Sequence, residues 1–113
     1  GGPMMGQALF SLDLPVSKTS SALTCFTKDM VAAQAPTACI RCGRCVAACP
    51  SHLIPPMMMK AALKNDCEAF EKVNGMECME CGSCTYVCPA RRPLTQAFKD
   101  LRRQVAANRR KKA

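Results

Sequence analysis

Large aromatic side chains are scarce in this chain, which has four phenylalanines, one tyrosine and no tryptophan among its 113 residues. This length predicts a single domain. A small domain without large rings has little apolar surface to bury, so its core is hard to stabilise by burial alone. The composition therefore indicates that another source of cross-links holds the fold together.

Two further shortages narrow the class of protein. Histidine occurs once, at His52, which excludes zinc fingers built from paired cysteines and histidines. No run of about 20 apolar residues is present, so no segment is expected to span a membrane. Residues 1–10 have neither the basic start nor the long apolar stretch of a secretory signal peptide, which weighs against a secreted disulfide scaffold.

Cysteine, by contrast, is abundant, and eight of the ten cysteines form two copies of one pattern. Each copy reads C-x-x-C-x-x-C-x-x-x-C-P, and every element of the second lies 39 residues after its counterpart. The first copy consists of Cys39, Cys42, Cys45, Cys49 and Pro50, and the second of Cys78, Cys81, Cys84, Cys88 and Pro89. This repeat is typical of proteins that hold two [4Fe–4S] clusters, so electron transfer is the predicted function and no catalytic residue is predicted.

The spacing also predicts which cysteines share a cluster. Three cysteines separated by two residues can wrap three iron atoms, and in two-cluster ferredoxins the fourth cysteine binds the other cluster. The first cluster is thus expected to take Cys39, Cys42, Cys45 and Cys88, and the second Cys78, Cys81, Cys84 and Cys49. Metal binding would supply the missing cross-links, because its free energy is also free energy of folding.

Two other uses of the cysteines remain as alternatives. Disulfide frameworks rarely repeat a four-cysteine block with identical internal gaps. Structural zinc prefers two separated C-x-x-C pairs per site, which leaves the third gap and the C-P ending unexplained in both copies. The corresponding alternative function is a zinc-held nucleic-acid module that uses the basic end of the chain, although no nucleic-acid partner is expected.

The chain divides into residues 1–35 and residues 36–113. In the first part, Ala8 to Leu14 is predicted to form a strand that ends at Pro15. This part reads as the end of a preceding β-rich domain plus a linker, with a disordered arm as the alternative. Because the chain starts with Gly1 rather than methionine, we expect it to be a piece of a longer polypeptide.

Residues 36–113 are expected to be mainly α-helical, with cysteine loops at 36–50 and 76–89. Two prolines followed by strong helix formers predict a helix over 57–64, whose three methionines should pack in the core. A second helix is predicted over 66–73, with Asp66 near its start and Gly75 just past its end. Pro93 should open a third helix. Its apolar face consists of Leu94, Ala97, Phe98, Leu101 and Val105.

The charge is unevenly distributed. The formal net charge is +8, which two clusters with their thiolates would lower to about +4. The basic run Arg109-Arg110-Lys111-Lys112 fits an anionic membrane surface, an acidic partner subunit, or a solvated helix end. The first cysteine loop is basic and the second acidic, which predicts a higher reduction potential for the first cluster.

The motifs and their flanks resemble the C subunit of the Rnf electron-transport complex. The resemblance rests on TACIRCGRC at 37–45, ECMECGSCTYVCP at 77–89, GGPMMG at 1–6 and LPVSK at 14–18. It covers nearly the whole chain. The cysteine motifs alone are specific to the class of cluster, and the GGPMMG context narrows the family.

The resemblance implies an α-helical ferredoxin domain with two [4Fe–4S] clusters, preceded by a short β or irregular segment. The chain would be the C-terminal electron relay of a peripheral subunit, on the cytoplasmic face of the bacterial cell membrane, in an ion-translocating ferredoxin:NAD oxidoreductase. FMN and NAD would bind only in the missing N-terminal part, and another iron–sulfur subunit would be the partner. The alternatives are the iron–sulfur part of a microcompartment cobalamin reductase and a free two-cluster ferredoxin.

Overall fold

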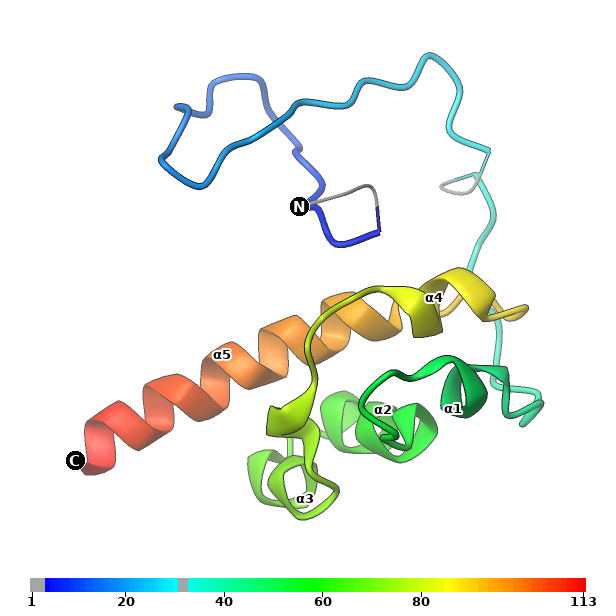
Figure 1. The fold of residues 1–113 in the computed structure, drawn as a ribbon, viewed down its shortest axis with the longest axis vertical. Coiled ribbons are helices and arrows are strands. Elements are labelled where there is room, and N and C mark those ends of the chain that lie inside the picture. The colour runs from blue at the N-terminus through cyan, green and yellow to red at the C-terminus, as the bar shows by residue number, and fades with distance from the viewer. Residues whose placement is uncertain (1–3, 31–32) are drawn as a thin grey trace.

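The computed structural model describes residues 4–30 and 33–113, and these residues form helices joined by irregular segments, with no strand among them. The helices are α1 (Arg44–Ala48), α2 (Pro55–Leu63), α3 (Cys67–Lys72), the short 3-10 helix η1 (Gly75–Glu77), α4 (Ser83–Val87) and α5 (Leu94–Lys112) (Figure 1). The predicted, mainly α-helical class is confirmed.

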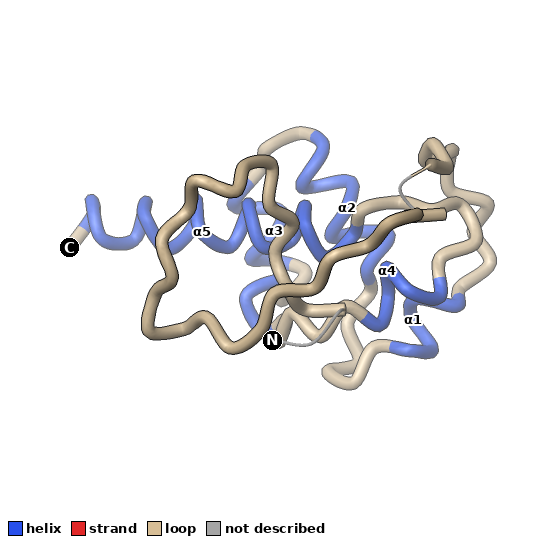
Figure 2. The backbone as a smooth tube through the Cα atoms, turned by 90° about the horizontal axis from the view of Figure 1, so that it is seen from above, coloured by secondary structure: helices blue, strands red, loops and turns tan. Residues whose placement is uncertain are grey.

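The described residues before α1 form a long, exposed loop that runs above the helices (Figures 1 and 2). The strand predicted over Ala8 to Leu14 is absent, because a strand needs a neighbour for its backbone hydrogen bonds and the described residues offer none. Phe10 is fully exposed in this loop. Residues 1–3 of the GGPMMG segment lie outside the described residues.

The duplication seen in the cysteines extends to the helices. α4 starts 39 residues after α1, and α5 starts 39 residues after α2. α1 contacts α4, and α2 contacts α5, so like elements of the two halves pack against each other (Figure 2). The domain is therefore built from two equivalent halves, with α3 and η1 as the connection between them.

A single apolar core joins α5 to α2 and α3. Phe70 and Phe98 are almost completely buried, and their ring centroids lie 6.3 Å apart in a tilted arrangement. The predicted face of α5 is confirmed, with Ala97 at its edge. Of the three methionines of α2, Met58 and Met59 are buried, but Met57 is 49% exposed, so the prediction was wrong for Met57.

Local sequence signals account for where these helices begin. Two prolines occupy the first positions of α2, where their missing N–H groups cost nothing. The Asp66 side chain accepts a hydrogen bond of 3.0 Å from the Ala69 N–H and caps α3. α3 is followed by Asn74 in a left-handed conformation. The predicted helices at 57–64, 66–73 and after Pro93 are thus confirmed.

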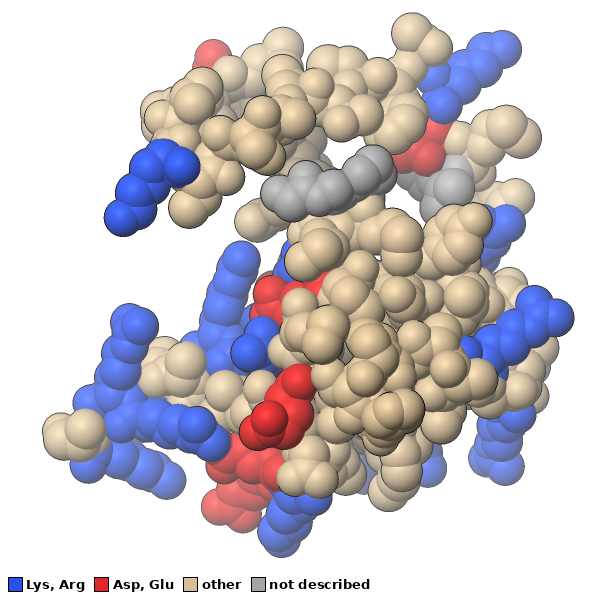
Figure 3. Space-filling model, viewed as in Figure 1, with Lys and Arg blue, Asp and Glu red and all other residues tan. Residues whose placement is uncertain are grey.

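Cationic side chains gather around the last turn of α5, as Figure 3 shows on one face of the molecule. Arg109 is paired there with Glu71 of α3, at 2.7 Å. Among the described residues, no helix combines the length and the apolar character needed to cross a membrane.

Candidate cluster-binding sites

Two hollows lie between the halves, and each is lined by four cysteines. The first site contains Cys39, Cys42, Cys45 and Cys88. The second site contains Cys49, Cys78, Cys81 and Cys84. Each site therefore combines three cysteines of one motif with the fourth cysteine of the other, which is the grouping that the sequence predicts for the cluster ligands.

The cysteines surround these hollows rather than a point. The first site encloses about 410 Å³ and the second about 360 Å³, counting space open to solvent. Within the described part of the chain, no three Cys, His, Asp or Glu side chains lie close enough together to hold a single metal ion. Because each thiolate of a cubane cluster binds a different iron atom, such a donor set fits a [4Fe–4S] cluster.

The backbone turns its N–H groups toward the sulfur atoms. The N–H groups of Arg41 and Glu80 donate to the Sγ of Cys39 and Cys78, both at 3.4 Å. The Leu53 N–H donates to Cys49 Sγ at 3.4 Å. Such donors stabilise thiolates and tune the potential of a bound cluster. These N–H donors are therefore compatible with a bound [4Fe–4S] cluster, as the cysteines are.

The two glycines of the motifs are needed for their backbone conformation. Gly43 has a φ of 74° and Gly82 a φ of 82°, in the left-handed region that residues with a Cβ rarely adopt. Each glycine precedes a five-residue helix, α1 or α4. These helices were not predicted. They carry the third cysteine of each motif toward its site.

The prolines fix the direction of the fourth cysteine. The helical region is disfavoured for a residue before proline, because the proline ring clashes with its backbone. Accordingly, Cys49 has a ψ of 116° and Cys88 a ψ of 114°, so α1 and α4 end there. The fourth cysteine of each motif is thereby placed at the other site.

Burial changes the acidity of several thiols. Burial raises the pKa of Cys45, Cys78 and Cys84 above the ordinary value. The pKa of Cys81 is lowered instead, chiefly by the hydrogen bond with Ser83. Because metals bind the thiolate, loading must displace protons from the first three thiols. Loading is therefore favoured as the pH rises and opposed as it falls.

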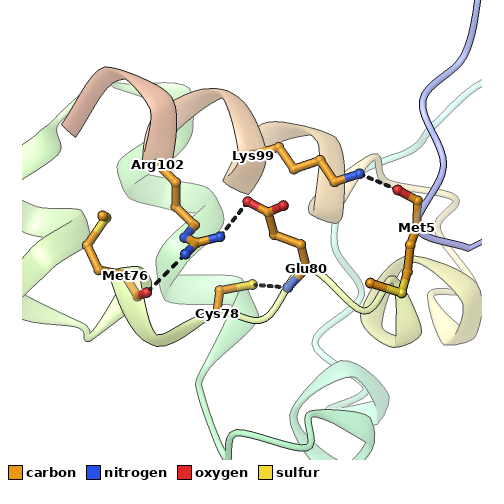
Figure 4. A network of polar contacts seen from close by, with 6 residues as sticks. All are labelled: Met5, Met76, Cys78, Glu80, Lys99 and Arg102. Carbon is orange, nitrogen blue, oxygen red and sulfur yellow. Dashed lines mark hydrogen bonds and ion pairs between the residues drawn. The ribbon is translucent and has the colours of Figure 1, made fainter. Parts of the chain in front are cut away.

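The surroundings of the second site include polar groups that the sequence analysis missed. Thr95 of α5 lines this site, with its Oγ1 3.7 Å from Cys84 Sγ. Arg102 pairs with Glu80 at 2.5 Å and donates to the Met76 carbonyl at 3.4 Å (Figure 4). A comparison of residues 39 positions apart would have revealed Thr95, since proline stands at the equivalent position, Pro56.

The N-terminal loop reaches the second site as well. Lys99 Nζ donates to the Met5 carbonyl at 2.6 Å (Figure 4). The Met4 carbonyl lies where a Cβ on Gly82 would be, whereas a Cβ on Gly43 would meet nothing within 4 Å. Residues 4–5 thus cover the second site on its Gly82 side, whereas no described residue covers the first site on its Gly43 side.

Comparison with known proteins agrees with this geometry. Residues 32–89 match the family model described as a 4Fe–4S dicluster domain. This match spans both cysteine motifs and ends at the proline of the second. It supports iron–sulfur clusters as the cofactor.

Curated proteins similar to this chain include C subunits of ion-translocating oxidoreductase complexes. That of the Na⁺-translocating ferredoxin:NAD⁺ oxidoreductase complex of Acetobacterium woodii is 44% identical over 111 residues, covering 98% of this chain and 25% of the relative. The proton-translocating counterpart of Clostridium ljungdahlii is 47% identical over 115 residues, covering 100% and 25%. The C subunit of the ion-translocating oxidoreductase complex of Pasteurella multocida is 42% identical over 106 residues, covering 93% and 13%.

These matches confirm the resemblance to the C subunit that the motifs and the N-terminal segment predicted. The chain spans about a quarter of the length of the first two relatives. With both four-cysteine motifs at its two sites and a family match over half of its length, the chain belongs to the 4Fe–4S dicluster domain family.

Proposed function

We propose that this chain is an electron relay that carries two [4Fe–4S] clusters. The observation that carries the proposal is the grouping of eight cysteines into two sites, each with cysteines from both motifs. A bound cluster supplies one-electron chemistry, and the chain holds it, excludes water from part of it and directs N–H groups toward its thiolates. Because each motif contributes cysteines to both sites, the two sites are kept at adjacent positions, as stepwise electron transfer requires.

The proposed ligand sets are Cys39, Cys42, Cys45 and Cys88 for the first cluster and Cys49, Cys78, Cys81 and Cys84 for the second. Pairs of serine substitutions separate these crossed sets from uncrossed ones. With crossed sets, Cys39→Ser with Cys88→Ser damages one cluster and should leave about four irons per chain. Cys39→Ser with Cys49→Ser damages both clusters and should leave none.

Iron and sulfide analysis, together with EPR spectroscopy, measures how many clusters each double variant retains. The two double variants remove the same number of thiols, so each is the matched control of the other. Uncrossed ligation gives the reverse result, with the second pair keeping one cluster. Unsubstituted protein that is colourless and free of iron after anaerobic reconstitution contradicts the proposal as a whole and favours the zinc-held module.

We further propose that the relay works in an ion-translocating ferredoxin:NAD oxidoreductase, at its C subunit, on the cytoplasmic face of the membrane. The names of the relatives and their coverage of the whole chain support this assignment. In it, FMN and NAD bind a preceding part of the subunit, and another iron–sulfur subunit exchanges electrons with the clusters. Residues 1–35 end a small β-rich domain that supplies the strand neighbour for Ala8 to Leu14, and residues 36–113 form the two-cluster domain.

The test is electron transfer in the assembled complex. The purified complex with the paired substitutions Cys39→Ser and Cys88→Ser in its C subunit should lose ferredoxin-dependent NAD⁺ reduction while keeping its flavin. Full activity in that variant would contradict a relay role for the first cluster. A microcompartment cobalamin reductase and a free ferredoxin are the alternatives, and association of the full-length subunit with the membrane fraction would contradict both.

The basic end of α5 is proposed to contact an anionic membrane surface. Arg109 to Lys112 are exposed, and each basic residue near such a surface contributes about 1 kcal/mol. The holo domain should sediment with vesicles that contain phosphatidylserine, and not with neutral vesicles, and salt should release it. Substitution of Arg110, Lys111 and Lys112 by glutamine should abolish sedimentation. If the holo domain does not bind anionic vesicles, the membrane contact is contradicted, and the basic run either contacts an acidic partner subunit or is a solvated helix end.

A further inference from the structure

The two halves of the domain provide an internal comparison, because positions 39 residues apart occupy equivalent places beside the two sites. Thr85 of α4 and Thr95 of α5 lie beside the second site. The equivalent positions beside the first site hold Val46 and Pro56. A pair of hydroxyl groups therefore distinguishes the second site from the first.

These hydroxyl groups form a connected chain of contacts that ends at a sulfur atom. Thr95 is 7% exposed. Its Oγ1 lies 2.7 Å from Thr85 Oγ1 and 3.7 Å from Cys84 Sγ. The backbone N–H of Thr95 donates to Thr85 Oγ1 at 2.9 Å. This series of hydrogen bonds thus runs from the first turn of α5 through Thr85 of α4 to Cys84, a proposed cluster ligand.

Ligation by iron fixes the direction of these hydrogen bonds. A cysteine bound to iron is a thiolate, which carries no proton and can only accept. The Thr95 hydroxyl can then bond Cys84 Sγ only as the donor, and in that arrangement Thr95 Oγ1 accepts from the Thr85 hydroxyl. Every donor in the chain then has an acceptor, and successive hydrogen bonds polarise one another.

We propose that Thr95, oriented by Thr85, is a positioning residue that raises the reduction potential of the cluster at the second site. The inference rests on the function proposed above. Reduction of the cluster from 2+ to 1+ adds one electron and no proton, so the thiolates become more negative. A hydroxyl that donates to a thiolate stabilises the reduced form more than the oxidised form.

Neighbouring charges act less specifically than this donor. Arg41 and Arg44 beside the first site are exposed, where solvent and salt screen them. Glu80 beside the second site is paired with Arg102, which offsets much of its charge. The Cys81 thiol donates to Ser83 Oγ at 3.4 Å, and once Cys81 is a thiolate this hydroxyl becomes a separate donor, which variants of Thr95 leave untouched.

An EPR-monitored redox titration of the reconstituted holo chain, with dithionite and mediators as the reductant, tests the proposal. Thr95→Val keeps the shape of the side chain and removes the hydroxyl. It should lower the equilibrium constant for reduction of one cluster about three- to tenfold, which is roughly 30–60 mV for one electron, and leave the other cluster unchanged. Thr85→Val should shift the same cluster in the same direction by less.

Three comparisons separate the hydroxyl from a general disturbance. Thr95→Ser keeps a hydroxyl and should keep the wild-type potential. Thr37→Val removes a hydroxyl that donates to the Ala90 carbonyl and not to a sulfur, so it should move neither potential. In unsubstituted protein, ENDOR spectroscopy should detect several exchangeable protons coupled to the reduced second cluster, because backbone N–H groups and Ser83 also lie beside its sulfur atoms, and Thr95→Val should remove one of these signals.

The outcomes distinguish this inference from the proposed function. Two intact clusters whose potentials do not change in Thr95→Val overturn the inference and leave the relay intact. An equal shift in Thr95→Ser also overturns it. If Thr95→Val does not retain its clusters, Thr85→Val takes its place, and an unchanged potential of the second cluster in that variant overturns the inference instead. Failure of the unsubstituted chain to bind clusters overturns the proposed function first.

Discussion

At the scale of single residues, the left-handed backbone conformations recur in pairs. Arg41 and Glu80 have φ angles of 57° and 58°, and Gly43 and Gly82 have φ angles of 74° and 82°. The strain of a left-handed residue with a Cβ is about 1–2 kcal/mol. The motifs therefore bear this strain at the first pair and avoid it at the second, where glycine stands in both copies.

Alanine at Gly82 should destabilise the holo domain more than alanine at Gly43. Both substitutions add the left-handed strain of about 1–2 kcal/mol. Only the Gly82→Ala methyl group also collides with the Met4 carbonyl and must displace residues 4–5. Denaturant unfolding, followed by the visible absorbance of the clusters, measures the difference.

Deletion of residues 1–6 provides the control for this comparison. It removes Met4, so the two alanine variants should then become equally stable. Equal losses in the undeleted chain would show that Met4 does not rest on Gly82.

Sequence reasoning at this scale reached the cysteines and not the threonines. The grouping of the eight cysteines at two hollows could be predicted because motif spacing is a local signal, and their binding of clusters stays a prediction. Thr85 and Thr95 meet at Cys84 only because the start of α5 packs against α4. Spacing within a motif carries no information about that packing. A comparison of positions 39 residues apart points to Thr95, but only the structure shows that its hydroxyl lies near Cys84.

At the scale of elements, α5 is the helix that holds the others together. One face contacts α2, α3, η1 and α4, and its last turn carries the basic run. Its contacts are of two kinds. Phe98 is 1% exposed against Phe70, whereas the Arg109 and Glu71 side chains of the ion pair are 63% and 38% exposed. Burial and surface charge can therefore be compared on one helix.

Phe98→Ala should cost far more stability than Arg109→Ala. Loss of a buried phenylalanine ring costs about 3–5 kcal/mol, a large share of the stability of a domain of this size. An exposed ion pair contributes about 0–1 kcal/mol, and salt weakens it further. Thermal unfolding of both holo variants at low and high salt measures this. A loss for Arg109→Ala that matches Phe98→Ala and persists in high salt would contradict this assignment.

A helix or strand could be predicted from the sequence where the signal for it lies within the segment itself. Prolines, the Asp66 cap and the apolar period of α5 act within a few residues, and the helices they predicted are present. α1 and α4 were missed because five residues are too few for a periodic pattern, and a glycine starts each. The strand predicted at Ala8 to Leu14 is absent from the described residues, since pairing depends on a neighbour outside the segment.

At the scale of the whole molecule, the two halves meet at two hollows. α1 packs on α4 and α2 packs on α5, but the core is confined to one side, around α5. Cysteines such as Cys42 remain exposed at the rim of the first site. The apolar core therefore packs α5 on its neighbours but is too small to hold them without further cross-links, and the loops around the hollows also depend on a bound group that joins both motifs.

Removal of the clusters should unfold most of the domain. The free energy of cluster binding is also free energy of folding, and each proposed cluster joins one half of the chain to the other. Chelation of iron under anaerobic, reducing conditions should abolish the absorbance near 400 nm and most of the helical circular dichroism together. Reconstitution with iron and sulfide should restore both. Phe98→Ala should make the chain less able to recover, because it also removes a ring that is 1% exposed in the apolar core. A cluster-free chain that keeps its full helical signal would show that the apolar core suffices, and that the clusters bind a preformed fold.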